Sequence, residues 1–406
     1  MNRIREISGG VCAPKGFKAS GIHCGIRKNK VKKDLALIVS EKRCTAAGVY
    51  TRNLVKGAPI LVTKAHIADG CAQAVIVNSG NANTCNDNGI EIAEGMCSLV
   101  EKHTGIAAGD VVVASTGVIG QKLSLEPIQG GMAALVEGLG ANSDAAAEAI
   151  MTTDTVKKQI SFSFMLGGKE CRMGAIAKGV GMICPNMATM LMFVTTDVAI
   201  SAQMLQLALS EDVKSSFNML SVDRDTSTND TLCILANGLA GNAEITRKGA
   251  DFTTFKKVLH LVTTAMCRML AADGEGATKL IECTVKGTKT LKDARLAAKA
   301  VVCSDLLKAA MFGADANWGR VLCALGYSGA CLDVNKIDVD FRSKAGVLPV
   351  CRGGAGIEFS EERAKVILSE NVICIDIYAN FGTKKATAWG CDLTYDYVKI
   401  NGDYRT

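Results

Sequence analysis

Residues 178–197 combine side chains that could carry out nucleophilic chemistry. They read KGVGMICPNMATMLMFVTTD, with glycine and proline in the first half and apolar and β-branched residues in the second. The first half predicts a loop, and the second predicts a buried strand over residues 189–196. Thr189 would then be a hydroxyl held rigidly at the start of a core strand, behind a loop that can bend and be cut.

The hydroxyl of Thr189 needs a base before it can act as a nucleophile. Taken alone, Thr189 is most simply an ordinary strand threonine bonded to a neighbouring carbonyl, because threonine is common in strands. An N-terminal threonine, however, carries its own α-amine, whose unperturbed pKa is roughly 7.7–8.0. Cleavage between Ala188 and Thr189 would create that amine. Burial and a cation such as Lys178 would lower its pKa, leaving a neutral base at neutral pH.

The same stretch resembles the self-cleavage site of the ornithine acetyltransferase family, the glutamate N-acetyltransferases of arginine biosynthesis. Members carry K-G-x-G-M, two variable residues and P-N-M-A-T-M-L. They cut themselves between Ala and Thr and use the new N-terminal threonine as nucleophile. The matching residues here are Lys178, Gly179, Gly181, Met182, Pro185, Asn186, Met187, Ala188, Thr189, Met190 and Leu191. Cys184 stands where many relatives have histidine. The resemblance implies two chains, residues 1–188 and residues 189–406.

A second motif follows a strand predicted over residues 110–114. Residues 115–120, Ser-Thr-Gly-Val-Ile-Gly, set a side-chain hydroxyl beside a backbone N–H. Two such donors are what an oxyanion hole requires, although a glycine after a strand is common and proves little by itself. In the family the oxyanion hole lies on the Thr-Gly pair of this segment, which implies Thr116 and Gly117.

Three further segments, MTTDT, DGEGATK and the terminal NGDYRT, match substrate-binding motifs of the family. The residues they imply are Thr152 or Thr153, Glu275, Asn401 and Thr406. The sequence does not decide between the two threonines. A cation such as Lys178 suits the α-carboxylate that acetylornithine and glutamate share, so Lys178 is also expected to bind substrate.

Other family motifs are present with single departures. The segment VDRDTSTND has Arg224 where the family has glycine, which disfavours a positive-φ turn there. The segment GADANWGR has Ala316 in place of proline. The segment NSGNAN, which begins at Asn78, indicates a tight turn when taken alone and lies near the active site in the family.

These motifs imply a glutamate N-acetyltransferase that moves an acetyl group from N2-acetyl-L-ornithine to L-glutamate through an acetyl-threonine intermediate. This chemistry requires no metal or nucleotide cofactor. Some relatives also accept acetyl-CoA, and the sequence leaves that open. The cleaved chains are expected to assemble as two N-terminal and two C-terminal chains, without nucleic acid or membrane partners.

Two alternatives compete with this interpretation. One is a self-cleaving amidase or aminopeptidase of the related fold, which passes its acyl group to water instead of to a second amino acid. The other is a non-catalytic binding protein that retains the fold. The terminal NGDYRT and the DGEGATK segment favour the transferase over the amidase. The presence of Thr189, Thr116 and Lys178 together disfavours the binding protein.

Composition limits the class of protein. A chain of 406 residues with 48% hydrophobic and 21% charged residues predicts a globular protein whose hydrophobic core is large enough for two or three domains. The net charge of +6 is spread along the chain, and the basic run at 27–33 lacks interleaved aromatics, so nucleic-acid binding is not indicated.

No signal-peptide core or membrane-spanning stretch is found, so we expect a cytoplasmic protein whose 17 cysteines are reduced. The cysteines contain no CxxC pair, and the four histidines no recognisable metal-ligand pair.

The elements that must position these residues alternate between strands and helices, which predicts an α/β protein. The resemblance implies a self-cleaving, N-terminal-nucleophile-like sandwich with mixed sheets between helical layers, in two lobes. Strands are expected at residues 34–40, 46–51, 59–63, 73–77, 110–114, 159–165, 336–342, 372–379 and 387–400. Helices are expected at residues 133–151, 202–217, 252–270 and 291–312.

Overall fold

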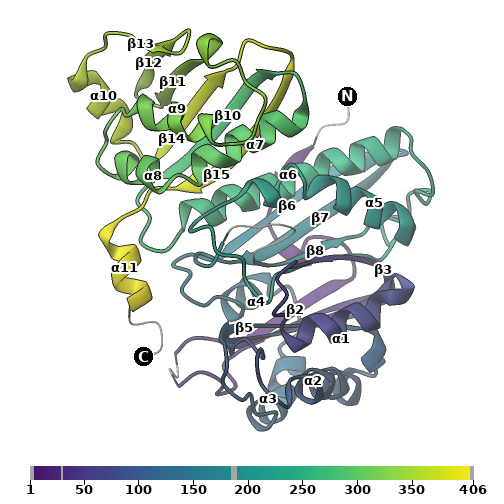
Figure 1. Cartoon of the computed structure of the whole chain (residues 1–406). Coiled ribbons are helices and arrows are strands. Elements are labelled where there is room, and N and C mark those ends of the chain that lie inside the picture. The colour runs from purple at the N-terminus through teal and green to yellow at the C-terminus, as the bar shows by residue number, and fades with distance from the viewer. Residues whose placement is uncertain (1–3, 29–30, 184–189, 403–406) are drawn as a thin grey trace. The chain divides into compact units, whose positions relative to one another are not determined.

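The computed structural model describes residues 4–28, 31–183 and 190–402. The chain divides into two compact units, each with its own β-sheet (Figure 1). Unit 1 consists of the described residues of Met1–Gly179, Asn186–Val213 and Thr226–Met266. Unit 2 consists of those of Val180–Pro185, Lys214–Asp225 and Cys267–Thr406. The predicted α/β class with mixed sheets in two lobes is confirmed.

Unit 1 is built on a mixed sheet with the strand order β1-β6-β7-β8-β9-β3-β4-β5, and β2 also pairs with β3. The pairs β4–β5 and β8–β9 are parallel, and the other pairs are antiparallel. The strands are β1 (Arg5–Ile7), β2 (Phe17–Ile22), β3 (Leu35–Tyr50), β4 (Cys71–Asn81), β5 (Val111–Val118), β6 (Lys158–Leu166), β7 (Lys169–Lys178), β8 (Leu191–Thr196) and β9 (Thr231–Ala236).

Helices lie on both faces of this sheet. Along β4, Ala74 and Ile76 belong to a buried cluster with residues of α2 and α3, whereas Val75 and Val77 belong to a second cluster with residues of α4. This alternation is the period of two that a strand buried on both faces requires. The helices of unit 1 are α1 (Ala58–His66), α2 (Gly89–Thr104), α3 (Glu126–Glu137), α4 (Ser143–Ala149) and α5 (Ala202–Asp212). Helix α6 (Ala250–Ala272), predicted over 252–270, is confirmed; its residues up to Met266 belong to unit 1.

Several predicted elements of unit 1 have different bounds. The strands expected at 34–40 and 46–51 are one strand, β3, whose register with β4 shifts between Val39 and Cys44 before it pairs with β9. Residues 59–63, expected as a strand, lie in α1. Proline at the start of that helix presets a helical φ, and Ile60 and Val62 face the core as residues of a helix.

The expected helices at 133–151 and 202–217 are also interrupted. The first is the end of α3 and all of α4, because Gly138 and Gly140 separate them and glycine is a poor helix former. The second ends at Asp212 and is followed by a short 3-10 turn, Phe217–Met219. Strand β4 continues to Asn81, so the first residues of the NSGNAN segment belong to the sheet and not to a turn.

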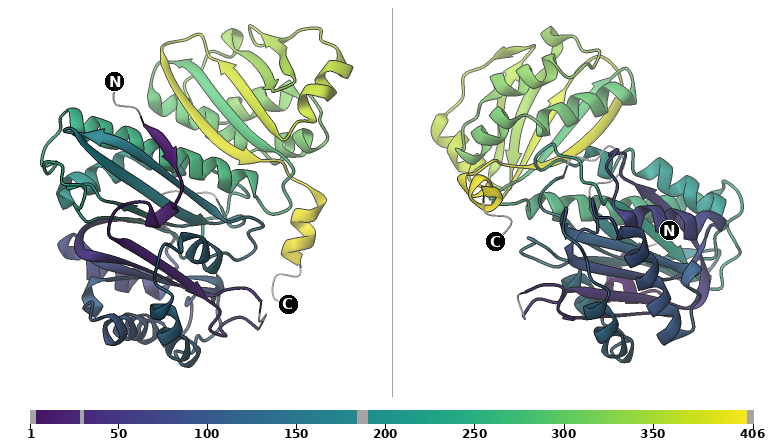
Figure 2. Two further views of the ribbon diagram at one scale, coloured as in Figure 1. Left: turned by 180° about the vertical axis from the view of Figure 1, so that it is seen from behind. Right: turned by 60° about the horizontal axis from the view of Figure 1, so that its bottom comes forward.

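Unit 2 contains a second mixed sheet, in the order β13-β12-β11-β14-β10-β15. Its strands are β10 (Leu280–Thr288), β11 (Asp338–Ser343), β12 (Gly346–Arg352), β13 (Ala355–Gly356), β14 (Val372–Tyr378) and β15 (Lys384–Cys391). Its helices are α7 (Leu291–Val302), α8 (Asp305–Phe312), α9 (Trp318–Gly326), α10 (Glu361–Leu368) and α11 (Tyr395–Gly402). Helix α7 packs against β10 and β15, and the strands of this sheet are seen from the other side in Figure 2.

Two expectations for unit 2 need correction. The helix expected at 291–312 is two helices, since Ser304 caps α8 by accepting a hydrogen bond from the Leu307 N–H. The strand expected at 387–400 ends at Cys391, and the residues after Thr394 form α11. Among the described residues, no helix is both long and apolar enough to cross a membrane.

Candidate active site

Two strand ends in unit 1 build the predicted oxyanion segment. Strands β4 and β5 run parallel, and their register sets Gly117 opposite Gly80. Gly117 has a φ of +136°, and a side chain at this position would collide with the backbone of Gly80 and Asn81. Glycine is therefore required here, because other residues rarely adopt this φ and would not fit beside the neighbouring strand. Thr116, half-buried, carries its hydroxyl on the adjacent residue.

Lys178 places a cation next to that hydroxyl. It is the last residue of β7 and is 8% exposed, and its Nζ donates a hydrogen bond to Thr116 Oγ1 at 3.2 Å. A protonated lysine can only donate, so the Thr116 O–H is directed toward some other acceptor. An oxygen that develops negative charge would be such an acceptor, and Lys178 would strengthen the interaction.

The register of the sheet sets the start of β8 beside Lys178. Lys178 and Leu191 are directly paired across β7 and β8. On the other side, the Met190 carbonyl accepts a hydrogen bond from the Thr231 N–H at 2.9 Å. The chain that follows Thr189 therefore enters the sheet between β7 and β9. The predicted residues that lie outside the described part of the chain are Cys184, Ala188, Thr189 and Thr406.

Thr152 and Thr153 lie in the segment between α4 and β6. Both are half-buried, and the backbone N–H of Thr152 donates to the Asp154 carboxylate at 3.0 Å. The structure brings the segment close to Lys178 through Asp154, which receives a hydrogen bond from the N–H of Gly179. It does not single out either threonine as the substrate contact.

Asp154 is a residue of this site that was missed in the sequence. Its side chain and that of Lys158 are completely buried, and Lys158 Nζ lies 2.8 Å from Asp154 Oδ1. Burial acts to raise the pKa of Asp154, but the charges of Lys178 and Lys158 outweigh it and hold the pKa at about 2. Asp154 is thus ionised at neutral pH. The available signal was the i, i+4 spacing of Asp and Lys inside the MTTDT region.

Asn229, in the VDRDTSTND segment, ties the loops of the site together. Its Nδ2 donates to the carbonyls of Ala82 at 2.5 Å and Ser115 at 2.9 Å. Its Oδ1 accepts a hydrogen bond from the Thr84 hydroxyl at 2.6 Å. One buried amide therefore joins the NSGNAN segment to the residue that precedes Thr116. The motif was recognised in the sequence, but this role was not.

Asp230 follows Asn229 and is 2% exposed. Burial raises the pKa of Asp230 well above its usual value, although Ser227, Lys178 and Thr51 act in the opposite direction. Its Oδ2 has no hydrogen-bond partner among the described residues. The site in unit 1 therefore contains two buried carboxyl groups near the same lysine, Asp154 with a lowered pKa and Asp230 with a raised pKa.

In unit 2 the structure joins the two other described substrate-binding candidates. Asn401 Nδ2 donates to Glu275 Oε2 at 2.9 Å, and the Glu275 N–H donates to the Val180 carbonyl at 2.8 Å. Glu275 is 8% exposed, and a side chain at position 181 would overlap its carboxylate. A side chain at position 181 would therefore push the Glu275 carboxylate away from the loop before the predicted cut.

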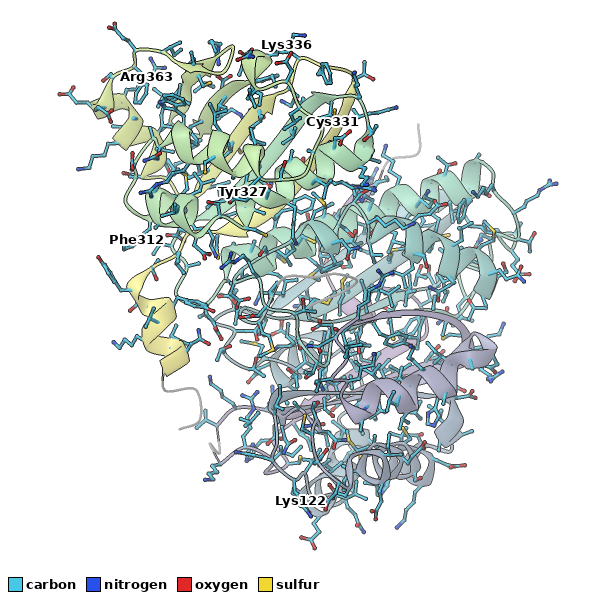
Figure 3. The ribbon with its side chains drawn as sticks, viewed as in Figure 1. Lys122, Phe312, Tyr327, Cys331, Lys336 and Arg363 are labelled. Carbon is cyan, nitrogen blue, oxygen red and sulfur yellow. The ribbon has the colours of Figure 1, made fainter. Side chains whose placement is uncertain are left out.

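The end of α8 and the DGEGATK segment hold the helix that carries Asn401. The Thr394 hydroxyl donates to the Gly276 carbonyl at 2.6 Å. Phe312, labelled in Figure 3, meets Tyr395 edge to face with ring centroids 5.8 Å apart. The C-terminal residues that the sequence would leave to fray are therefore anchored as far as residue 402.

Asp223 anchors the loop before the predicted cut and was also missed. Its carboxylate accepts hydrogen bonds from the N–H groups of Met182 at 2.6 Å and Ile183 at 2.8 Å. Met182 has a φ of +55°, an uncommon conformation for a side chain of this size. Burial raises the pKa of Asp223, although the same two backbone bonds act to lower it. The hydrogen bonds hold the loop in this strained turn.

Arg224 and Ala316, the two residues of unit 2 that depart from the family motifs, both lie in the described part of the chain. Arg224 has a φ of +71°, so the positive-φ turn that arginine was expected to disfavour does form. Its guanidinium pairs at 2.6 Å with Asp305, the first residue of α8, and the contact is exposed. Ala316 is buried, at 4% exposure.

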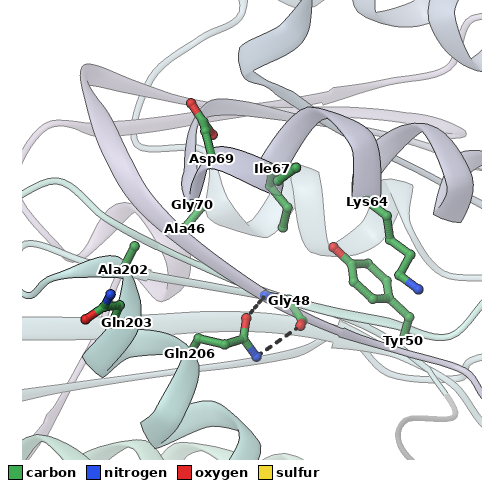
Figure 4. Close-up of a pocket in the computed structure, with 11 residues that line it drawn as sticks. Ala46, Gly48, Tyr50, Lys64, Ile67, Asp69, Gly70, Ala202, Gln203 and Gln206 are labelled. Atoms are coloured by element: carbon green, nitrogen blue, oxygen red, sulfur yellow. Dashed lines mark hydrogen bonds between the residues drawn. The ribbon is translucent and has the colours of Figure 1, made fainter.

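A cavity of about 540 Å³ lies elsewhere in unit 1, between β3, the end of α1 and the start of α5 (Figure 4). Gln206 closes one side with two hydrogen bonds to the Gly48 backbone, which Figure 4 marks by dashed lines. Its lining contains none of the residues predicted to act on substrate.

Metal and disulfide chemistry find no support in the described residues. There, no group of three or more His, Cys, Asp or Glu side chains is arranged to hold a metal ion. No disulfide joins two cysteines of this part of the chain.

Comparison with known proteins agrees with these motifs. The model of the ArgJ family matches residues 18–406. The chain is 50% identical over 392 residues to the arginine biosynthesis bifunctional protein ArgJ 1 of Clostridium acetobutylicum, covering 96% of each chain. It is 50% identical over 403 residues to the ArgJ bifunctional protein of Symbiobacterium thermophilum, covering 98% of this chain and 99% of that one. A crystal structure of the Bacillus halodurans ArgJ protein is 44% identical, with a TM-score of 0.49 over 52% of this chain and 97% of that chain.

Proposed function

The chain belongs to the ArgJ family, and we propose that it is a glutamate N-acetyltransferase of arginine biosynthesis. The acetyl group moves from N2-acetyl-L-ornithine to L-glutamate through an acetyl ester on Thr189. The observation that carries this proposal is the hydrogen bond between Lys178 and Thr116 at the end of the sheet where β8 begins.

The nucleophile is made by self-cleavage. The Thr189 hydroxyl attacks the carbonyl carbon of Ala188, the peptide nitrogen leaves as an amine, and an ester joins the two residues. Water then hydrolyses the ester, which frees the Thr189 hydroxyl and leaves a carboxylate on Ala188. The products are residues 1–188 and residues 189–406.

The sheet of unit 1 supports continued association of the two products. After the cut, β8 and β9 belong to the C-terminal chain, whereas β7 and β3 belong to the N-terminal chain. The pairs β7–β8 and β3–β9 join them by backbone hydrogen bonds in a buried sheet. We propose further that two copies of each chain assemble into a heterotetramer.

Acetyl transfer then uses the new amine as base. The amine takes the proton of the Thr189 hydroxyl as its oxygen attacks the acetyl carbonyl carbon of acetylornithine. The Thr116 hydroxyl and the Gly117 N–H stabilise the oxyanion, and ornithine leaves with the proton. Glutamate attacks the acetyl ester through its own amine and restores the Thr189 hydroxyl.

Substrate recognition in this proposal is ionic. The Lys178 ammonium binds the α-carboxylate of either substrate, and Thr152 or Thr153 contributes a hydroxyl. Glu275 and Asn401, joined in unit 2, bind the amine end together with Thr406. The same site could accept acetyl-CoA as a second acetyl donor. We place the enzyme in the cytoplasm, where free thiols persist.

Intact-protein mass spectrometry tests the proposal. The wild type should show two masses that meet at the Ala188–Thr189 bond, and Thr189→Ala should show one uncut, inactive chain. Thr189→Ser should keep part of both activities. Thr253→Ala, an exposed threonine of the same C-terminal chain, is the matched control and should behave as wild type.

Acetylornithine supplied without glutamate should add one acetyl mass to residues 189–406. Glutamate should discharge it quickly and water slowly. Rapid turnover without glutamate would instead indicate the amidase. An uncut wild type that transfers acetyl groups at full rate would contradict the N-terminal amine mechanism.

A further inference from the structure

We infer that Asp154 is a positioning residue that holds Lys178 in place, and protonated, as the donor to Thr116. The effect of Asp154 on catalysis rests on the proposed function. Its effect on the position of Lys178 rests on the hydrogen bonds around its carboxylate. In this inference Asp154 acts through Gly179 and Lys178.

Three donors converge on the Asp154 carboxylate. Oδ1 accepts hydrogen bonds from Lys158 Nζ and from the Gly179 N–H, each at 2.8 Å, and Oδ2 accepts one from the Thr152 N–H at 3.0 Å. The bonds from Lys158 and Gly179 are buried, so water does not compete with them, whereas the bond from Thr152 is part-buried. The carboxylate therefore joins the substrate segment at Thr152 to the end of β7.

The bond to Gly179 fixes the direction in which the chain leaves β7. Strand β7 ends at Lys178, and Gly179 turns away with a φ of +145°. Because Asp154 binds the N–H of Gly179, it holds the peptide group that joins Lys178 to Gly179. The direction of the Lys178 side chain toward Thr116 Oγ1 follows from the same peptide group.

The negative charge of Asp154 also favours the protonated form of Lys178. Lys178 is 8% exposed, and burial favours the neutral form of an amine. The ionised Asp154 opposes this, since Lys178 is the leading cation that stabilises its negative charge. Lys158, which pairs with Asp154, and Asp230, whose pKa Lys178 lowers, are two further titratable groups beside this pair. A neutral Lys178 could accept a hydrogen bond from the Thr116 hydroxyl, which would then be unavailable as an oxyanion donor.

Asp197 offers a matched control because it performs only the anchoring part of this role. It is a buried aspartate of the same unit, directly after β8. Its carboxylate accepts backbone hydrogen bonds from Arg172 at 2.7 Å and Lys15 at 3.1 Å. It lies at the end of β8 opposite to the one that follows Thr189. Asp197→Asn thus reproduces the loss of a buried backbone acceptor without touching Lys178.

The test compares Asp154→Asn with Asp197→Asn, using the cleavage rate, kcat and KM over a range of pH. We expect Asp154→Asn to cut and transfer about 10- to 100-fold more slowly, as small misplacements of catalytic groups do. The alkaline limb of its activity should move about 1–3 pH units lower, because Lys178 loses its proton more easily. Asp197→Asn should keep the wild-type pH profile even if it unfolds more readily.

A double variant separates positioning from simple instability. Asp154→Asn leaves Lys158 buried without its partner, which by itself costs stability. Asp154→Asn/Lys158→Met removes that defect, so it should recover stability and keep the altered pH profile. Recovery of wild-type cleavage and pH profile in the double variant would overturn the inference.

A direct titration keeps the inference testable if the proposed reaction fails. The ε-carbon resonance of Lys178, assigned through Lys178→Arg in ¹³C-lysine-labelled protein, should titrate at lower pH in both Asp154→Asn and the double variant. An unchanged Lys178 titration would overturn the inference whether or not the wild type transfers acetyl groups. Absent cleavage in the wild type with a shifted titration would instead count against the proposed function alone.

Discussion

The Lys178 ammonium donates a hydrogen bond to the Thr116 hydroxyl at 3.2 Å, although 62 positions of sequence separate the two residues. The bond joins the end of β7 to the end of β5 in unit 1. In the proposed function this lysine binds the substrate carboxylate and also orients an oxyanion donor. Both proposed roles require the charged form of the amine.

Replacing Lys178 should affect both half-reactions. Lys178→Met removes the charge and the hydrogen bond, so we expect acetyl transfer from acetylornithine and to glutamate to fall about 100-fold each. Lys178→Arg keeps a cation and should recover part of the activity. Steady-state kinetics of processed protein provides the measurement. Lys169→Met, at the exposed first position of β7, is the control. Normal kinetics in processed Lys178→Met would disprove the assignment.

Gly117→Ala should disrupt the oxyanion segment through its backbone. A new side chain would collide with Gly80 and would hold an unfavourable φ, so we expect a loss of at least about 1–3 kcal/mol of unfolding free energy. Transfer should fall more than stability explains. Gly120→Ala is the control, since Gly120 also has positive φ, at +79°, but no atom lies near a side chain added there. Equal transfer rates in the two variants would contradict the role of Gly117.

The Glu275–Asn401 hydrogen bond should matter for binding more than for turnover. Asn401→Ala or deletion of residues 401–406 should leave folding and self-cleavage largely intact. It should raise the KM for acetylornithine about 10-fold or more, the value expected for a bond to a charged group. The control is Lys399→Ala, an exposed position on the same helix. Unchanged kinetic constants after the deletion would show that α11 has no part in the site.

The buried carboxyl of Asp230 should make stability fall as pH rises. Its folded pKa is raised well above the usual value, so the folded chain keeps a proton that the unfolded chain loses above about pH 4. Asp230→Asn should remove this slope, and its stability relative to the parent should therefore grow between pH 4 and pH 7. Urea unfolding in the uncut Thr189→Ala background measures it. Exposed Asp225→Asn is the control, and parallel pH curves for Asp230→Asn and its parent would refute the prediction.

Short sequence motifs are sufficient to predict most of the candidate site. Thr116, Gly117 and Lys178 are recognisable from their neighbours in the chain, because an oxyanion donor pair and a loop-to-strand junction are local patterns. The structure joins these three in unit 1, and it joins Glu275 to Asn401 in unit 2. Thr189, the proposed nucleophile, lies outside the described residues and remains a prediction.

Local patterns were less successful where glycine, proline or a capping serine changes the course of the backbone. Residues 59–63 have the composition of a strand but form part of α1, and residues 291–312 form two helices instead of one. The spacing of apolar residues predicts which side chains are buried. It does not predict whether a segment pairs with a strand of the sheet, because that pairing depends on hydrogen-bond partners distant in sequence.

The sequence by itself determined the chemistry that this protein carries, because residue types and short spacings decide which groups can act as nucleophile, base and oxyanion donor. Only the tertiary structure decided the environment of those groups. The roles of Asp154, Asn229 and Asp230 are not evident from their local sequence, yet burial and contacts across the sheet lower the pKa of one carboxyl and raise that of the other. Desolvation and charge pairing arise between segments that meet only when the chain folds.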